Sequence, residues 1–187
     1  MLRNLPFTID SLHLAYRSQT KVADVISECF RRINQADDAG IFISQSSLQY
    51  TERAISELGE FDPISKPLWG IPFAVKDNID VLGLTTTAGC PDFSYEAPSD
   101  SFVVNLLREA GAICVGKTNL DQFATGLVGV RTPYPIPKNA IDPTIVPGGS
   151  SSGSAVSVAH GIVTFSLGTD TAGSGRVPAA LNSIVGL

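Results

Sequence analysis

The sequence predicts an α/β fold with a mostly parallel or mixed sheet covered by helices. From residue 65 onward, short apolar runs alternate with amphipathic stretches, as expected for strands joined by helices. Hydrophobic residues make up 43% of the 187 residues, which is enough for a sizeable core. Residues 184–187, Ile-Val-Gly-Leu, resemble the start of a buried strand. We therefore expect one α/β domain that is truncated at its C-terminus.

The first 64 residues are predicted to be helical. After Val22, apolar residues follow at offsets of 3, 4, 7, 8 and 11, which is typical of one face of an amphipathic helix. Shorter helices are expected at 12–16 and 48–58. No catalytic constellation stands out in this region, so we interpret residues 1–64 as a helical segment that packs on the core.

Residues 65–187 are interpreted as the α/β core itself, incomplete at its C-terminal end. Prolines at five positions between 133 and 147 remove backbone donors, so that stretch is expected to be a loop. The predicted strands are 71–75, 112–115 and 162–167, and the predicted helices are 101–110, 119–127 and 154–160.

Composition and charge exclude several classes of protein. With 13 basic and 18 acidic residues, the net charge of −5 argues against a dedicated nucleic-acid binder. The longest stretch without a charged residue, 143–169, is too polar and too interrupted by glycine and proline to cross a membrane. Cys29, Cys90 and Cys114 have no metal-ligand spacing and are expected to be free thiols, so we predict a cytoplasmic protein.

Residues 111–118 match the P-loop pattern GxxxxGK[ST]. That motif needs a strand, then a loop around phosphate, then a helix. Here the residues that would form the loop are Ala, Ile, Cys and Val, which favour a buried strand, and a predicted helix precedes them. We interpret Lys117 as part of a strand, which makes nucleotide binding the weaker hypothesis.

Residues 149–153 match the G-x-S-x-G nucleophile elbow. The elbow needs a strand before the serine, and an acid and a histidine later in the chain. Pro143 and Pro147 argue against the strand, and the only later histidine, His160, falls within the next predicted helix. The elbow stays open as an alternative because a longer chain could supply the histidine.

Two loops of small residues carry a stronger signal. Residues 148–154 are all glycine or serine, and a second loop, 168–178, surrounds Ser174. A flexible linker would have polar flanks, but an apolar helix and strand follow the first loop. We therefore expect both loops to pack in a core, where small residues let backbones approach closely, and to place two serine hydroxyls side by side.

Serine hydroxyls need a base, and no histidine is convincing in that role. A lysine that burial keeps neutral can serve, because desolvation lowers the lysine pKa. Lys76 follows the apolar run 71–75 and is the candidate. The alternative is an ordinary surface lysine beside Asp77.

Three stretches of the chain resemble the amidase signature family. They are residues 70–79, GIPFAVKDNI; residues 148–154, GGSSSGS; and residues 168–180, GTDTAGSGRVPAA. The resemblance extends over nearly the whole chain and implies an amidase-signature-type core. Amidase domains of this family are longer than the present chain, so the resemblance also implies that the core is partial.

The resemblance implies a Ser–cis-Ser–Lys triad that needs no metal and no cofactor. Ser174 is the implied nucleophile, and Ser150, reached through a cis Gly149–Ser150 peptide, passes its proton to neutral Lys76. The implied oxyanion hole consists of the backbone N–H groups of Thr171, Ala172, Gly173 and Ser174, and the loop-supporting residues are Gly149, Asp170 and Arg176, the last two as a pair.

Finer details resemble the branch of the family that hydrolyses allophanate (urea-1-carboxylate). These details are the triple serine at 150–152, the stretch 117–129 and the Ala-Gly-Ser-Gly-Arg sequence at 172–176. The branch implies release of ammonia through an acyl-enzyme, and a biotin-dependent urea carboxylase as partner or fused domain. It also implies a homodimer for a full-length enzyme, and a carboxylate-binding group beyond residue 187.

Two further alternatives remain open. The same chemistry could serve another amide, as in the amidase subunit of an amidotransferase for transfer RNA. The chain could also be a truncated, non-catalytic product.

Overall fold

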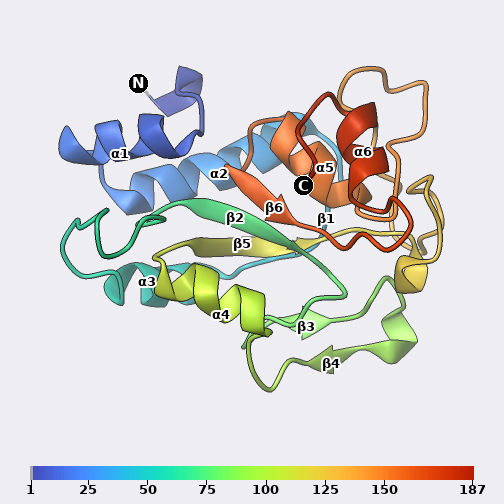
Figure 1. The fold of residues 1–187 in the computed structure, drawn as a ribbon, viewed down its shortest axis with the longest axis horizontal. Helices are drawn as coiled ribbons and strands as arrows, with labels where there is room; N and C mark the ends of the chain where they lie inside the picture. The colour runs from blue at the N-terminus through green and yellow to red at the C-terminus, as the bar shows by residue number, and fades with distance from the viewer. Residues whose placement is uncertain (1) are drawn as a thin grey trace.

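The computed structural model describes residues 2–187 and contains a mixed sheet between two layers of helices (Figure 1). Its strand order is β1-β5-β2-β6, with β2 parallel to both neighbours and β1 antiparallel to β5. The α/β class predicted from the sequence is confirmed. The strands are β1 (Phe42–Gln45), β2 (Pro72–Lys76), β5 (Ile113–Thr118) and β6 (Phe165–Leu167).

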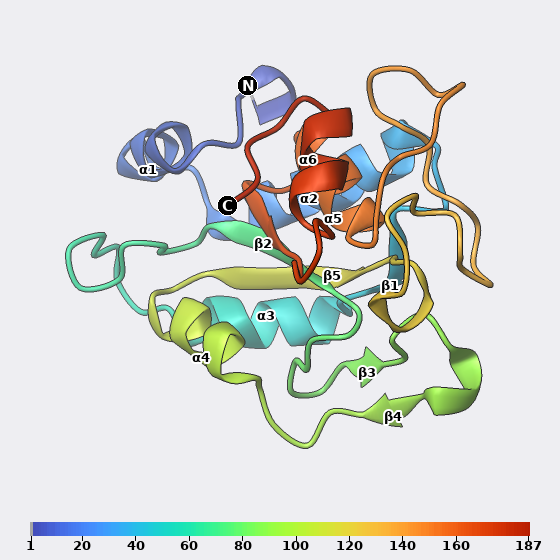
Figure 2. The same ribbon diagram turned by 45° about the vertical axis from the view of Figure 1, so that its right-hand side comes forward.

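Helices lie on both faces of this sheet, as the two views show (Figures 1 and 2). One layer holds α1 (Ile9–Arg17), α2 (Val22–Ala36), α5 (Ser152–Ala159) and α6 (Arg176–Leu181). The other holds α3 (Leu48–Ser56) and α4 (Phe102–Glu109). A separate antiparallel pair, β3 (Thr85–Thr86) and β4 (Tyr95–Glu96), and three short 3-10 turns, η1 (Leu2–Asn4), η2 (Pro91–Phe93) and η3 (Gln122–Ala124), complete the structure.

Alternation along β2 separates two apolar clusters. Ala74 belongs to the cluster of α1, α2 and α5, whereas Phe73 and Val75 pack with Val104 of α4. Because successive side chains of a strand point to opposite faces, Lys76 points to the same face as Ala74. The last residue of β2 is thus aimed at the layer that contains α5.

A register shift between β2 and β5 turns the Lys117 side chain to the opposite face of the sheet from Lys76. Phe73 is paired with Cys114, but Val75 is paired with Lys117, so β5 holds one extra residue. Gly116 lies in this irregular stretch, and a Cβ atom there would come within 2.6 Å of the Ser44 carbonyl oxygen. Such a bulge redirects the side chains that follow it, and Lys117 consequently lies on the face opposite to Lys76.

Two elements differ from the sequence prediction in the first two thirds of the chain. The region before residue 64 was predicted to be helical, but it also supplies β1, which pairs with β5 at the sheet edge. The predicted helix at 119–127 is wrong: only the turn η3 forms there, and Phe123 and Ala124 have positive φ angles. The division of the chain at residue 64 remains a prediction.

The side chains of Asn119 and Asp121 explain why no helix forms at 119–127. Asn119 Oδ1 accepts a hydrogen bond from the Leu120 N–H at 2.8 Å. The Asp121 carboxylate accepts from the N–H groups of Gly129 at 2.9 Å and Arg131 at 2.8 Å. Asn and Asp side chains compete in this way with helical hydrogen bonds.

The expected strand at 184–187 does not form either. Ser183 has a φ of 56°, and the Ile184 N–H donates to the Ala179 carbonyl at 3.0 Å, so these residues end α6 instead. Val185 is 85% exposed.

All three cysteines are free, as predicted, and two of them, Cys29 and Cys114, are buried. Within residues 2–187, no helix has the length and apolar character needed to cross a membrane.

Candidate active site

Lys76 ends β2 and is fully buried. Its Nζ donates hydrogen bonds to Ser150 Oγ at 2.7 Å and to Thr169 Oγ1 at 2.6 Å. Burial lowers the pKa of Lys76 to about 8, against the opposing effect of the Asp121 and Asp170 carboxylates. The surface-lysine alternative is therefore wrong, and a substantial fraction of Lys76 is neutral slightly above neutral pH.

Ser150 lies in the glycine- and serine-rich loop that precedes α5 and is also fully buried. The peptide between Gly149 and Ser150 is cis, as the family resemblance implies. The Ser150 carbonyl accepts a hydrogen bond from the Asp121 N–H at 3.1 Å. A Cβ atom on residue 149 would collide with Asp121 Oδ2 and lie 2.5 Å from the Gly129 nitrogen. Only glycine fits at position 149.

Ser174 lies in the loop between β6 and α6 and is 7% exposed. Its carbonyl accepts a hydrogen bond from the Ser151 N–H at 3.0 Å, which holds the two serine loops against each other. Among the hydrogen bonds of residues 2–187, none involves Ser174 Oγ. The hydrogen bond between Lys76 and Ser150 is thus formed, whereas no hydrogen bond joins the hydroxyls of Ser150 and Ser174.

One of the four predicted oxyanion-hole donors already has an acceptor in the structure. The Gly173 N–H already donates to Asp170 Oδ1 at 2.7 Å, so it is not free to bind a developing oxyanion in this conformation. The N–H groups of Thr171, Ala172 and Ser174 have no acceptor within the described part of the chain. Their role as an oxyanion hole, which needs donors aimed at the developing charge, remains a prediction.

Asp170 and Arg176 pair, as expected. The guanidinium donates from Nε at 2.8 Å and from Nη2 at 2.9 Å to the two carboxylate oxygens. Asp170 also accepts from the N–H groups of Gly175 at 3.2 Å and Arg176 at 3.0 Å. These bonds, first among them those from Arg176, hold the pKa of Asp170 well below its usual range. The pair fixes the start of α6 next to Ser174.

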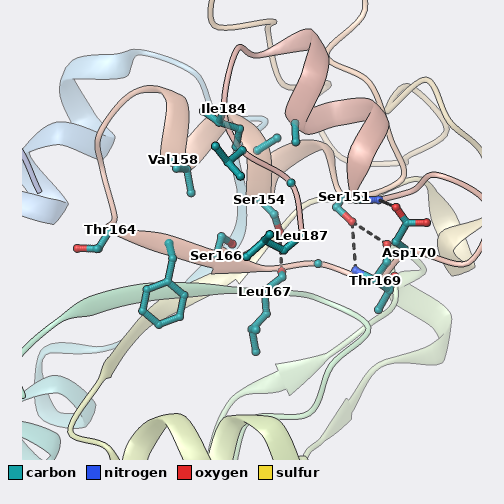
Figure 3. A pocket seen from close by; sticks show the side chains of 17 residues that line it. Ser151, Ser154, Val158, Thr164, Ser166, Leu167, Thr169, Asp170, Ile184 and Leu187 are labelled. Atoms are coloured by element: carbon teal, nitrogen blue, oxygen red, sulfur yellow. Dashed lines mark hydrogen bonds between the residues drawn. The ribbon is translucent and has the colours of Figure 1, made fainter. Parts of the chain in front are cut away.

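The sequence did not assign Thr169 or Asp121 to the site, and it offered Ser151 only as the serine of a nucleophile elbow. Thr169 binds Lys76, and its backbone exchanges hydrogen bonds of 3.3 Å with Ser151 Oγ (Figure 3). Asp121 supports the backbone of Ser150. Thr169 and Ser151 lie inside stretches that resemble the amidase signature family, and Asp121 lies inside the stretch 117–129 that resembles one branch of it. That position is the signal that could have identified them.

A cavity of about 600 Å³ lies beside these loops. β6, α5 and residues 184–187 form its walls, and Ser151, Thr169 and Asp170 stand at one end (Figure 3). Lys76, Ser150 and Ser174 do not line it. The cavity is therefore a neighbour of the three residues and not the space in which they meet.

The two misleading motifs are resolved by the fold. Lys117 lies within β5 and is fully buried, and residues 113–118 of the motif form that strand, so no phosphate loop is present there, as expected from the sequence. Ser151 immediately precedes α5 without a strand before it, and His160 caps the opposite end of that helix, where it borders a depression with Arg3 and Arg31. Among residues 2–187, no histidine side chain is hydrogen-bonded to Ser150, Ser151 or Ser174.

Known proteins resemble this chain over most of its length. The family model named Amidase matches residues 24–187. The urea amidolyase of Saccharomyces cerevisiae is 69% identical over 121 residues, which cover 65% of this chain and 7% of that protein. A glutamyl-tRNA(Gln) amidotransferase subunit of Exiguobacterium sibiricum is 42% identical over 186 residues, covering 96% of this chain and 38% of that protein.

Solved structures agree with these sequence matches. The allophanate hydrolase of Kluyveromyces lactis superimposes with a TM-score of 0.82 and 44% identity, covering 92% of this chain and 29% of that one. The urea amidolyase of K. lactis gives 0.83 and 44%, covering 94% and 11%. The chain thus spans well under half the length of these relatives. The family match and the shared fold together show that this chain belongs to the amidase family.

Proposed function

We propose that the chain carries the catalytic residues of an amidohydrolase that uses Ser174, Ser150 and Lys76. One observation supports this most strongly: Lys76 is fully buried, and its Nζ is bonded to two hydroxyls. No carboxylate lies within ion-pair distance of Lys76 in the described residues. A buried amine with such partners can accept a proton from Ser150.

The proposed reaction begins when Ser174 Oγ attacks the carbonyl carbon of an amide. Ser174 gives its proton to Ser150 Oγ, whose own proton passes to Lys76 Nζ along the 2.7 Å hydrogen bond. The same route then returns a proton to the leaving nitrogen, which departs as ammonia. Water attacks the acyl-enzyme in the second half of the reaction, with Lys76 again receiving the proton.

The negative charge of the tetrahedral intermediate would fall near the amides of residues 171–174. Thr171, Ala172 and Ser174 offer free N–H donors, and the small side chains of Ala172 and Gly173 leave room for the oxyanion. Removal of one such donor costs about 3 kcal/mol of activation free energy in other enzymes. If the Gly173 N–H is to join them, it must first leave Asp170 Oδ1.

We propose allophanate as the substrate. The high identity to a urea amidolyase and the fold match to an allophanate hydrolase support this choice. The enzyme that supplies allophanate would then be a urea carboxylase, present as a partner or a fused domain. The second candidate is the amide of glutamine, favoured by 42% identity over nearly the whole chain to part of a glutamyl-tRNA(Gln) amidotransferase.

Ammonia release distinguishes the two substrates. Purified protein, in the form that the cell produces, is supplied with allophanate or glutamine, next to a Ser174→Ala variant. We expect release from allophanate that the substitution abolishes. Release from glutamine alone would favour the second candidate, and release that survives in Ser174→Ala would contradict the proposed nucleophile.

A further inference from the structure

A buried ion pair lies on the opposite side of the sheet from the proposed triad. Lys117 Nζ is 3.3 Å from Asp77 Oδ1, and both side chains are completely shielded from solvent. Lys117 Nζ also donates to the Thr85 carbonyl at 3.1 Å and to Thr86 Oγ1 at 3.0 Å. The proposed reaction uses neither charge. Buried ion pairs often add little net stability, so we consider a role for this pair other than stabilisation.

The ion pair holds the segment 85–89 against the sheet. Asp77 Oδ2 accepts hydrogen bonds from the Thr87 N–H at 2.9 Å and from the Thr87 hydroxyl. The Asp77 carbonyl accepts from the Ala88 N–H at 3.3 Å. Ala88 and Gly89 have φ angles of 51° and 72°, so this segment turns sharply just after the contacts with Asp77.

Segment 85–89 in turn holds the loop that supports Ser150. The Phe123 N–H donates to the Ala88 carbonyl at 2.8 Å, and Gln122 Nε2 donates to the Gly89 carbonyl at 3.1 Å. The neighbouring Asp121 N–H donates to the Ser150 carbonyl at 3.1 Å. A path of hydrogen bonds, joined by short stretches of backbone, therefore leads from Asp77 through both loops to Ser150.

This path closes into a ring at the proposed triad. Asp77 is covalently bonded to Lys76, and Lys76 Nζ is hydrogen-bonded to Ser150 Oγ. The two ends of the path are thus the two groups that must exchange a proton. A rigid arrangement of such groups matters, because misplacement by roughly 1 Å can reduce a rate by about 10²-fold.

We infer that Asp77 and Lys117 are positioning residues, whose ion pair sets the placement of Lys76 relative to Ser150 from the far side of the sheet. This inference rests on the proposed function. The ion pair would then align the proton relay in addition to any effect that it has on the stability of the fold.

A fluorophosphonate ester tests the alignment without the natural substrate. Ser174 Oγ bonds to phosphorus, fluoride leaves, and the serine proton passes through Ser150 to Lys76. The labelling rate at saturating reagent therefore measures how well the relay activates Ser174. Mass spectrometry identifies the labelled residue, and Ser174→Ala is the blank.

The informative variants are Lys117→Met and the double variant Asp77→Asn with Lys117→Met. The first leaves a buried carboxylate without its cation and lowers the melting temperature. The second removes both charges, so we expect its melting temperature to recover most of that loss. We expect both to label Ser174 at least about tenfold more slowly, with reagent affinity unchanged, because the relay is misaligned.

Glu28→Gln is the matched control. Glu28 is a buried carboxylate on α2, paired with Arg31 at 2.6 Å and Arg32 at 3.0 Å, and it touches none of the proposed triad. We expect this variant to lose stability and to label at the unaltered rate. The inference is overturned if the double variant regains the labelling rate together with its stability, or if Glu28→Gln slows labelling equally. Absence of Ser174 labelling in the unaltered protein would instead refute the proposed function, and the inference with it.

Discussion

Lys76 and Lys117 are two buried lysines on neighbouring strands, yet they have opposite surroundings. Neither side chain reaches solvent, and burial lowers the pKa of both. Lys76 meets two hydroxyls, those of Ser150 and Thr169. Lys117 meets the Asp77 carboxylate, which opposes the effect of burial on its pKa.

Burial alone therefore does not make a lysine a base. A carboxylate partner favours the ammonium form, whereas hydroxyl partners accept a hydrogen bond from an ammonium and can also donate to a neutral amine. The partner therefore decides whether a buried lysine serves as a counter-ion or as a proton acceptor. Here the extra residue in β5 gives the two lysines different partners, because it turns the Lys117 side chain to the face of the sheet opposite to Lys76.

The largest expected effect is the loss of activity in Lys76→Met. Without the base, ammonia release should fall by roughly 10²- to 10⁴-fold. The free energy of unfolding should stay the same or rise, since a buried amine is replaced by an apolar group of similar length. Steady-state ammonia release and urea denaturation measure the two quantities. Activity within tenfold of the unaltered protein would exclude Lys76 as the base.

The next effect concerns stability and falls on the other lysine. Lys117→Met leaves Asp77 buried without its cation, so the free energy of unfolding should drop by about 3–5 kcal/mol. Urea denaturation at neutral pH measures this loss. A loss below about 1 kcal/mol, which is typical of an exposed pair, would show that the Asp77–Lys117 pair is not the buried ion pair described above.

A smaller effect is the dependence of stability on pH. The pKa of Lys76 is about 8 in the folded protein, against about 10.4 in an unfolded chain. Between these two values the unfolded chain holds a proton that the folded protein does not, so stability rises with pH. Lys76 should contribute an increase of roughly 3 kcal/mol across this window.

The Lys76→Met variant isolates this contribution from the titration of other groups. The difference in unfolding free energy between the variant and the unaltered protein should change across the same pH window and be constant below it. Activity should rise with pH and level off above about pH 8, where Lys76 is neutral. A pH-independent difference in stability would contradict the low pKa of Lys76.

The smallest expected effect comes from Thr169→Val. The substitution keeps the shape of the side chain but removes the hydroxyl that accepts a 2.6 Å hydrogen bond from Lys76. One lost hydrogen bond of this kind corresponds to about a tenfold decrease in kcat. Thr169→Ser restores the hydroxyl and should restore the rate. Equal rates for the valine and serine variants would remove Thr169 from the site.

The parts of the fold that could be predicted depend on local patterns. The strand before Lys76 is an uninterrupted apolar run, and α2 has a clear apolar stripe. The helix predicted at 119–127 does not form, because the conformation there depends on hydrogen bonds that the Asp121 carboxylate accepts from the N–H groups of Gly129 and Arg131. The spacing of apolar residues along the sequence gives no information about such hydrogen bonds.

The residues of the candidate site could likewise be predicted only where the local sequence carries a signal. Lys76, Ser150 and Ser174 could be named because they stand in family-like stretches of unusual composition. Thr169 stands in such a stretch too but was not named, because nothing in the loop sequence shows that its hydroxyl, and not that of Thr171, reaches Lys76. The pairing of Asp77 with Lys117 depends on the register shift at Gly116, which only the three-dimensional structure reveals.

The most direct test of the contrast between the two lysines is an NMR titration of their side-chain nitrogens. Spectra recorded from about pH 6 to pH 10 follow each group across the usual lysine range, and Lys76→Met and Lys117→Met assign the two signals. We expect Lys76 to lose its proton near pH 8, and at lower pH than Lys117. If Lys117 lost its proton first, or if Lys76 remained protonated up to pH 10, the assignment of Lys76 as the base would be contradicted.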